Sequence, residues 1–271
     1  MTTGSLVLLI VALAGAGAAT GFLAGLLGVG GGAFLVPVHY ELFSFFGVDE
    51  SVRMHMVLGT SLAVIVPTSL RSFSGHYAKG AVDMQTWRRL APWVAMGVTL
   101  GVLTAKFAST SELKWVWIVA GSLIGLKFAF GRDDWRLGSE LPRGKGLEVT
   151  ATIIGLVSAL MSIGGGMFIV SLLTLYGVPI HRAVATSAAF GPVIAVPGTI
   201  GFMWAGWDVP LRPPYSIGYV NLLAAGLIMP ASMLAVPLGV RAAHALSKRK
   251  LEVAFAVFLA CVVARFLWSL L

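Results

Sequence analysis

Charged residues are scarce in this chain. Asp, Glu, Lys and Arg make up 11% of its 271 residues, and 58% of the residues are hydrophobic. Soluble domains carry roughly 25% charged residues. Several long apolar runs, such as 6–27 and 220–240, reach the roughly 20 residues that cross a bilayer core. The alternation of apolar and polar residues that is typical of a membrane β-barrel is lacking. The composition therefore predicts an all-α polytopic membrane protein with a lipid bilayer around it.

Cysteine is almost absent, and the motifs of common enzyme classes are lacking. Cys261 is the single cysteine, which excludes an internal disulfide and a thiolate metal cluster. No HExxH or GxSxG motif is present. Gly28-x-Gly30 is similar to a dinucleotide fingerprint, but the strand and the soluble βαβ unit that such a loop requires are lacking. We therefore expect no enzymatic activity, no metal site and no cofactor.

Basic residues outnumber acidic ones, and the formal net charge is +8. The basic residues are scattered over short loops between the apolar runs, as in a positive-inside topology, so we expect no nucleic-acid partner. The first apolar run follows no basic residue and precedes no cleavage site. We interpret it as a retained segment and not as a signal peptide.

Two stretches of the chain are similar to each other. A triple glycine occurs in GFLAGLLGVGGGAFLVP at 21–37 and again, 134 positions later, in GLVSALMSIGGGMFIV at 155–170. The pattern His-x4-Thr-Ser then follows in both places, at 55–61 and at 181–187. The common order of these motifs favours an internal duplication over chance similarity of Leu-, Ala- and Gly-rich sequence.

The duplication defines the expected organisation of the chain. Each half ends with two further apolar segments, and the polar stretch 131–146 separates the halves. We therefore expect repeat one at 1–130, a linker at 131–146 and repeat two at 147–271.

Two topologies are compatible with the glycine runs, and the positive charges distinguish between them. If each glycine-broken stretch crosses the membrane once, the halves run parallel and the loop Lys and Arg residues divide eight against eight. If each stretch turns back as a helical hairpin, the division is twelve against four, which the positive-inside rule favours. Each half is then a hairpin plus three transmembrane helices, and the second repeat is inverted. Both termini lie outside, the linker lies in the cytoplasm, and the plan is one that secondary transporters commonly use.

The glycine breaks are suited to binding an anion. Non-helical backbone at membrane depth is tolerated where it is packed in protein or lines a cavity. A helix that begins after such a break presents unpaired N–H groups and partial positive charge, and glycine lets a ligand approach them. Close helix packing is the alternative role for these small residues. The predicted anion-binding glycines are Gly28, Gly30, Gly31, Gly32, Gly164, Gly165 and Gly166.

Hydroxyl groups recur at matched positions in the two halves. Thr60 and Ser61 in the first half correspond to Thr186 and Ser187 in the second, and Ser162 adds a hydroxyl beside the second glycine run. These groups could donate hydrogen bonds to the same anion. Their alternative role is to bond back to carbonyls of their own helix, which is common in membranes.

Four titratable residues are candidates for coupling transport to protons. Two are the paired histidines, His55 and His181, which could instead be interfacial. The other two, His39 and Glu41, lie in the short apolar stretch after the first glycine run. Ionisable residues inside membrane segments are functional hypotheses by default, although Glu41 could also simply reach the outer interface.

Together the motifs resemble one known family. GLLGVGGGAFLVP at 25–37, IGGG at 163–166 and Ala-Thr-Ser at 185–187 are similar to the motifs of the sulfite exporter TauE/SafE family of membrane permeases. The resemblance implies an integral inner-membrane transporter with duplicated halves that exports or takes up sulfur-containing anions. Repeat two departs from the pattern of repeat one at three positions, where Ala159, Ser162 and Ser171 replace Gly25, Gly28 and Pro37.

The sequence therefore predicts a multi-pass protein of the inner (plasma) membrane that works as a secondary transporter of small anions. The expected substrates are sulfur-containing: an organosulfonate, sulfoacetate or sulfite. The expected site is a central pocket formed by the two glycine breaks. A passive anion channel of the same fold is the alternative. A homo-oligomer is compatible with the sequence.

Overall fold

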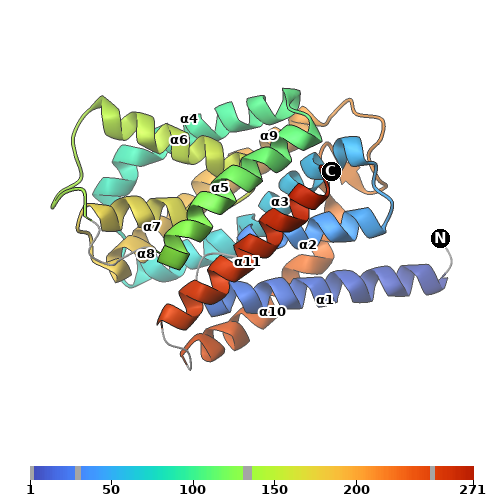
Figure 1. Ribbon diagram of the computed structural model, residues 1–271, viewed down its shortest axis with the longest axis horizontal. Helices are drawn as coiled ribbons and strands as arrows, with labels where there is room; N and C mark the ends of the chain where they lie inside the picture. Colours follow the sequence, from blue (N-terminus) through green and yellow to red (C-terminus); the bar gives the residue numbers. More distant parts are fainter. Residues whose placement is uncertain (1–2, 28–31, 131–135, 245–247) are drawn as a thin grey trace.

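The computed structural model is built almost entirely of helices (Figure 1). It describes residues 3–27, 32–130, 136–244 and 248–271. Within these residues the first half contains α1 (Thr3–Leu27), α2 (Gly32–Phe45), α3 (Glu50–Ala78), α4 (Met84–Phe107) and α5 (Thr110–Phe130). The second half contains α6 (Lys145–Met161), α7 (Gly166–Leu175), α8 (Ile180–Ala188), α9 (Phe190–Ala205), α10 (Leu222–His244) and α11 (Lys248–Trp268). A two-residue antiparallel ribbon, β1 (Ser216–Ile217) and β2 (Val220–Asn221), precedes α10.

The helices have the lengths and surfaces of membrane spans. In the described part of the chain, five helical stretches are long and apolar enough to cross a bilayer: α3, α4, α5, the stretch of α8 and α9, and α10. Large apolar side chains cover their outward faces, for example Leu123 and Leu126 on α5 and Leu234 and Leu238 on α10. These findings confirm the predicted all-α polytopic membrane fold.

One of these span-length stretches consists of two helices. The stretch from Ile180 to Ala205 is divided at Ala189 into α8 and α9. Pro192 explains the division, because it has no N–H to bond the carbonyl of Ala188 and its ring crowds that carbonyl. The two pieces together still make one span-length stretch.

Each half begins with a pair of helices that turns back on itself. The α1–α2 and α6–α7 pairs are both in contact, and in Figure 1 the free ends of α1 and α2 lie at the same end of the molecule. The chain reverses in the second pair through two residues in the left-handed region, Ser162 at φ 50° and Gly165 at φ 70°. Glycine adopts this conformation at no steric cost, and its presence at this turn matches the predicted hairpin.

The connections fall at two opposite ends, which we call the terminal end and the linker end. The terminal end comprises 45–50, 108–112, 206–222 and 265–271, and the linker end comprises 78–84, 136–145 and 175–180. At the terminal end, the Thr110 hydroxyl donates to the Glu50 carbonyl over 2.9 Å. At the linker end, the Leu137 N–H donates to the Leu175 carbonyl over 2.8 Å.

This arrangement bears on the two topologies. The start of α1 and the end of α11 lie at the terminal end, and residues 136–145 lie at the opposite end (Figure 1). The hairpin topology requires this placement of the connections. The inverted two-fold relation of the halves, and the cytoplasmic position of the linker, stay predictions.

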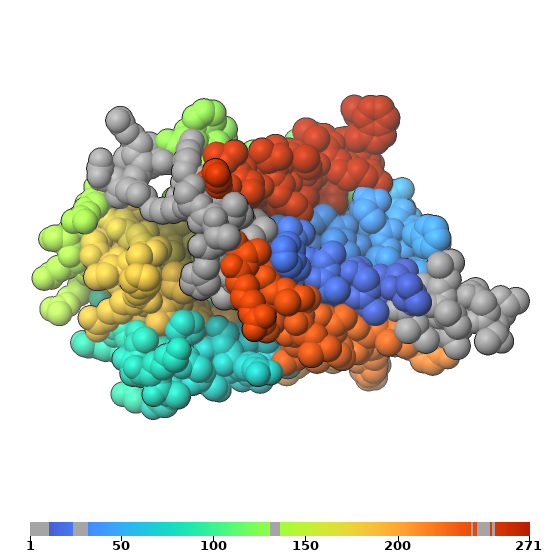
Figure 2. Space-filling view, turned by 90° about the horizontal axis from the view of Figure 1, so that it is seen from below, coloured from blue at the N-terminus to red at the C-terminus, as the bar shows by residue number. Residues whose placement is uncertain are grey.

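Two helix pairs pack with their backbones in close approach. Along α1, an added Cβ at Gly17 or Gly21 would overlap the backbone of Ile228 or Ser232 on α10, and Figure 2 shows these two helices side by side. The α4–α6 pair is built alike, because a Cβ on Gly155 would overlap the Val94 carbonyl. Small residues give membrane helices this close contact. Gly21 and Gly155 are 134 positions apart, the same separation as the two glycine runs.

Candidate functional site

The two glycine breaks meet at the middle of α3. A Cβ added to Gly32, the first residue of α2, would lie 2.5 Å from the Ser162 carbonyl oxygen and 2.9 Å from Cδ1 of Ile65. On the opposite break, the Cβ position of Gly164 lies 3.5 Å from Cγ2 of the same Ile65. The structure thus brings Gly32 and Gly164 to one residue of α3. Gly28, Gly30 and Gly31 lie outside the described residues.

The second break is fixed to α3 by its serine. Ser162 is fully buried, and its Oγ donates a 2.6 Å hydrogen bond to the Leu58 carbonyl of α3. The hydroxyl that we expected to bind the anion therefore has a structural partner. This contact holds the tip of the hairpin against α3.

The N-terminus of α7 is left open by the same turn. Gly165 is the N-cap, and it has no side chain to accept from the first-turn N–H groups. Those groups, on Gly166, Met167 and Phe168, have no partner within the helix by its geometry. Gly164 and Gly166 are half-buried and Gly165 is buried, so this end lies inside the protein.

One residue beside this open end was missed by the sequence analysis. Ser158 lies on α6 with its side chain fully buried, and its Oγ has no hydrogen-bond partner among the described residues. The Oγ lies 3.8 Å from the position that a Cβ on Gly165 would occupy. The signal was its spacing, since Ser158 precedes Ser162 by four residues and so shares its helix face. The side chain is therefore a polar group at the open helix end, with its hydrogen-bonding capacity unused.

The paired threonines both hold the first residues of a helix in the other half. The Oγ1 of Thr60 accepts from the N–H of Asn221 over 3.0 Å, and the Asn221 side chain accepts from Ala224 N at the start of α10. The Oγ1 of Thr186 accepts from the N–H of Asp83 over 3.0 Å. Asp83 is in turn the N-cap of α4. Both threonine oxygens are thus already used as acceptors.

The charge of Asp83 is stabilised at the linker end. Burial alone would raise the pKa of its carboxyl, but hydrogen bonds from the N–H and hydroxyl of Thr86 and the nearby charge of Arg182 lower it overall. The Asp83–Arg182 distance is 3.5 Å. The carboxylate therefore caps α4 in its ionised form.

The paired serines have different partners. Ser187 donates to the Val184 carbonyl of its own helix over 2.8 Å, which is the alternative role that membrane serines commonly take. Ser61 instead forms a 2.8 Å hydrogen bond with Nδ1 of His39 on α2. Ser61 and His39 are both fully buried.

The other predicted proton-coupling residues are dispersed. His55 donates from Nε2 to the carbonyls of Ala105 and Ala108 at the end of α4, at 2.9 and 3.1 Å. The His181 side chain is exposed, so the two histidines of the matched motifs do not share one environment. Glu41 forms a 2.8 Å ion pair with Arg265, and both side chains are about half exposed. Of the four candidates, His39 lies next to the residues that join the two breaks.

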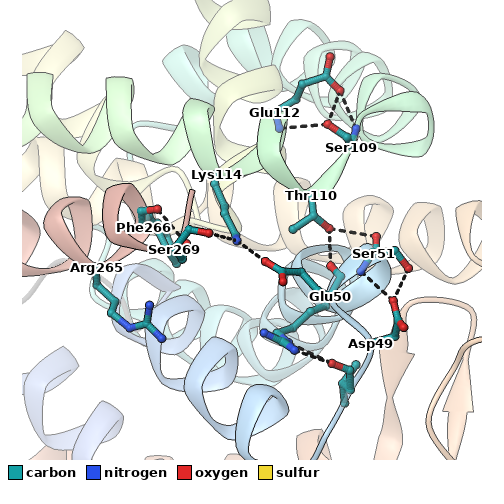
Figure 3. Close-up of polar contacts among 12 residues, drawn as sticks. Asp49, Glu50, Ser51, Ser109, Thr110, Glu112, Lys114, Arg265, Phe266 and Ser269 are labelled. Carbon is teal, nitrogen blue, oxygen red and sulfur yellow. Dashed lines mark hydrogen bonds and ion pairs between the residues drawn. The ribbon is translucent and has the colours of Figure 1, made fainter. Parts of the chain in front are cut away.

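A polar network at the terminal end was also not foreseen. Lys114 is 1% exposed and forms a 2.9 Å ion pair with Glu50 (Figure 3). The ammonium also lies 3.5 Å from the carbonyl of Ser269 near the end of the chain. The ring of Tyr40 contacts three cationic groups, those of Arg53, Lys114 and Arg265. The network joins α2, α3, α5 and α11 at this end.

Metal ligands do not gather in the described part of the chain. Within residues 3–27, 32–130, 136–244 and 248–271, no group of three or more His, Cys, Asp and Glu side chains is placed to hold a metal ion. The groups available to a ligand at the breaks are backbone N–H groups and hydroxyls.

Comparison with known proteins identifies the family. Residues 13–266 match the family model described as Sulfite exporter TauE/SafE. A probable membrane transporter protein of Haemophilus influenzae is 34% identical over 248 residues, which are 91% of this chain and 93% of the relative. A probable membrane transporter protein of Methanocaldococcus jannaschii is 26% identical over 246 residues, 86% of each chain. No solved structure matches the chain. The protein is therefore a multi-pass membrane transporter that belongs to the sulfite exporter TauE/SafE family.

Proposed function

We propose that the protein is a secondary transporter of small sulfur-containing anions in the inner (plasma) membrane, and that it binds the anionic head group at the second glycine break. In this proposal the two halves, 1–130 and 147–271, are inverted repeats joined by the linker 131–146. The first break, which reaches the same part of α3 through Gly32, forms the other wall of the pocket.

The observation that carries the proposal is the open N-terminus of α7 beside Ser158. Three first-turn N–H groups and the positive end of the helix dipole point out of α7 at a buried position. The Ser158 hydroxyl is buried there with no partner, which costs about 1–3 kcal/mol unless a ligand supplies one. An anion would satisfy the N–H groups and the hydroxyl together.

The donor set favours a sulfonate or sulfite over a carboxylate. Each additional acceptor oxygen can accept a hydrogen bond from these N–H and O–H donors. A sulfonate has three such oxygens, and a carboxylate has two. A hydrogen bond to a charged group contributes about 1.5–3 kcal/mol. One additional bond therefore corresponds to a preference of about tenfold or more when the desolvation costs are similar.

Thermal unfolding of the purified protein tests the proposal. The panel contains sulfite, isethionate, sulfoacetate, sulfate, phosphate and the carboxylate analogue of isethionate, and an anion that binds the folded state raises its unfolding temperature by mass action. We expect sulfite or the sulfonates to give the largest rise. No rise with any of the six would contradict the proposal.

Two variants locate the site. Ser158→Ala should weaken binding of the best anion about tenfold, because one donor to the head group is lost. Ser69→Ala is the control, because Ser69 is also buried but donates to the carbonyl of Val66 in its own helix. Equal losses in both variants would show that Ser158 does not contact the anion.

A transport assay separates the carrier from the alternative, a passive channel. In proteoliposomes, a carrier gives saturable uptake of the labelled anion and exchanges it against unlabelled anion inside. We expect both properties. Uptake that rises linearly with concentration and shows no exchange would favour the channel.

A further inference from the structure

His39 and Ser61 form a buried polar pair between α2 and α3. Their Nδ1 and Oγ atoms are 2.8 Å apart, and both side chains are 0% exposed. The imidazole stacks on the ring of Phe43 at 5.8 Å between centroids. Its second nitrogen, Nε2, is buried with no hydrogen-bond partner among the described residues. A titratable ring is thus held in the membrane domain with half of its hydrogen-bonding capacity unused.

The pair lies beside the point where the two glycine breaks meet. Leu58, Ser61 and Ile65 are spaced three and four residues apart, so they share one face of α3. Leu58 accepts the hydrogen bond from Ser162, and Ile65 contacts the positions of Gly32 and Gly164. Ser61 therefore lies between the two contacts that fix the breaks to α3.

The hydrogen-bond inventory of the pair changes with the charge of the ring. A neutral imidazole has one N–H and one acceptor nitrogen, whereas the protonated ring has two N–H donors and no acceptor. In the protonated ring, Nδ1 is an N–H donor and can no longer accept the Ser61 hydroxyl proton. The Ser61 hydroxyl proton is then free to point at another acceptor, and the ring adds a full positive charge to a site that otherwise offers backbone dipoles.

Among the described residues around the ring, no other charged side chain is placed to supply this positive charge or to neutralise it. Of the other titratable residues on α2, Tyr40 lies among Arg53, Lys114 and Arg265, and Glu41 pairs with Arg265. On α3, Glu50 pairs with Lys114 and His55 bonds the end of α4. The other titratable residues of α3, Arg71, His76 and Tyr77, belong to its last two turns, at the linker end.

The neighbouring helices add little charge near the ring. Helix α1 has no titratable side chain in its sequence. On α11, which contacts α2 through Phe34 and Tyr40, Arg265 lies at the terminal end. The remaining charges of α11 belong to its first turns, at the other end of that helix. An uncompensated charge in this setting is costly, so protonation of His39 calls for an anion nearby.

We infer that His39 takes up one proton for each anion that the breaks bind, so that the protein is a proton–anion symporter. The inference rests on the proposed function. In the anion-free state the ring is neutral. In the loaded state a proton from the solvent resides on the ring, and Ser61 donates to the anion. The proton and the anion then cross the membrane together, with their charges compensated.

Calorimetric titration with isethionate tests the inference, and sulfoacetate takes its place if the thermal panel ranks it higher. A sulfonate stays ionised across the range in which imidazoles titrate, so a pH dependence comes from the protein. Measurement in two buffers with different heats of ionisation gives the number of protons taken up per anion. We expect about one for the parent protein near neutral pH, and binding that tightens as the pH falls.

Two variants assign the proton. His39→Gln should bind the anion with no proton uptake and with little pH dependence. His76→Gln, which replaces a histidine at the linker end, should keep the parent value. Ser61→Ala serves if His39→Gln does not fold: it should keep the proton uptake but bind the anion about tenfold more weakly, since one donor is lost.

Each outcome decides one question. Anion binding without proton uptake in the parent protein would overturn the symport inference and leave the proposed function intact. Proton uptake that survives in His39→Gln would overturn the assignment to His39. Absence of binding by every anion of the panel would contradict the proposed function and this inference together.

Discussion

At the scale of single residues, the matched threonines of the two halves both have structural partners. Thr60 and Thr186 occur in the same pattern in the two halves, and both accept a backbone N–H from the residue that precedes a helix of the other half. The recurrence of these hydroxyls at matched positions suggested that they bind one anion, with bonds back to their own helices as the alternative. The sequence could not show that the partner lies 161 residues away for Thr60 or 103 for Thr186.

Thr186→Val should lower the stability of the folded protein. The substitution keeps the shape of the side chain but leaves the N–H of Asp83 without an acceptor, at a cost of about 1–3 kcal/mol. Thr199→Val is the matched control, because Thr199 is also buried and donates to the Ala195 carbonyl of its own helix. Unfolding in detergent measures both variants. Equal stabilities would show that the contact to Asp83 contributes little.

The N-cap of α4 should make stability depend on pH in acid. The pKa of the Asp83 carboxyl is lower in the folded protein than in the unfolded chain, so its ionised form stabilises the fold above the unfolded pKa. This contribution is lost as the pH falls through the lowered folded pKa. Asp83→Asn removes the titration, so the stability difference between parent and variant should shrink in acid.

Asp208→Asn is the control for the loss of a carboxylate, because Asp208 lies exposed at the terminal end and caps no helix in the described part of the chain. At neutral pH it should cost less stability than Asp83→Asn. A difference for Asp83→Asn that is independent of pH would contradict the role of the carboxylate.

At the scale of helices, the glycines have two distinct roles. At the second break, Gly165 opens α7 in a left-handed conformation after Ser162 has ended α6. Glycines within helices, such as Gly21, let two backbones approach. Both roles can be expected from the sequence, but they cannot be assigned residue by residue, since the assignment depends on which helix lies opposite.

Gly21→Ala should destabilise the protein, and Gly15→Ala on the same helix should not. A Cβ on Gly21 would overlap the backbone of Ser232 on α10, which cannot move aside as a flexible side chain would. Overpacking of this kind costs about 1–3 kcal/mol. Gly15 has nothing within 4 Å of its Cβ position, so alanine there should be neutral or stabilise by up to about 1 kcal/mol. Similar unfolding temperatures for the two variants would contradict the close α1–α10 packing.

At the scale of the whole molecule, the global plan was more predictable than the site. Hydrophobic run lengths, glycine runs and loop charges predicted an all-α fold with two hairpins, because these properties follow from the membrane alone. The His39–Ser61 pair, the unpartnered Ser158 and the buried Lys114 could not be derived in this way. Each depends on the rotation of a helix about its axis, which packing against distant segments determines.

Orientation in the membrane is the remaining global prediction. The start of α1 and the end of α11 lie at the terminal end, and residues 136–145 lie at the opposite one. The hairpin topology gives the linker face twelve Lys and Arg residues and the other face four. The positive-inside rule therefore predicts a cytoplasmic linker.

Thiol labelling tests this orientation. In a Cys261→Ala background, Ser139→Cys in the linker should resist a membrane-impermeant thiol reagent in intact cells, and Asp208→Cys at the terminal end should react. Both positions are exposed, so detergent should make Ser139→Cys reactive, which shows that shielding comes from the membrane. The reverse labelling pattern in intact cells would mean that the protein has the opposite orientation.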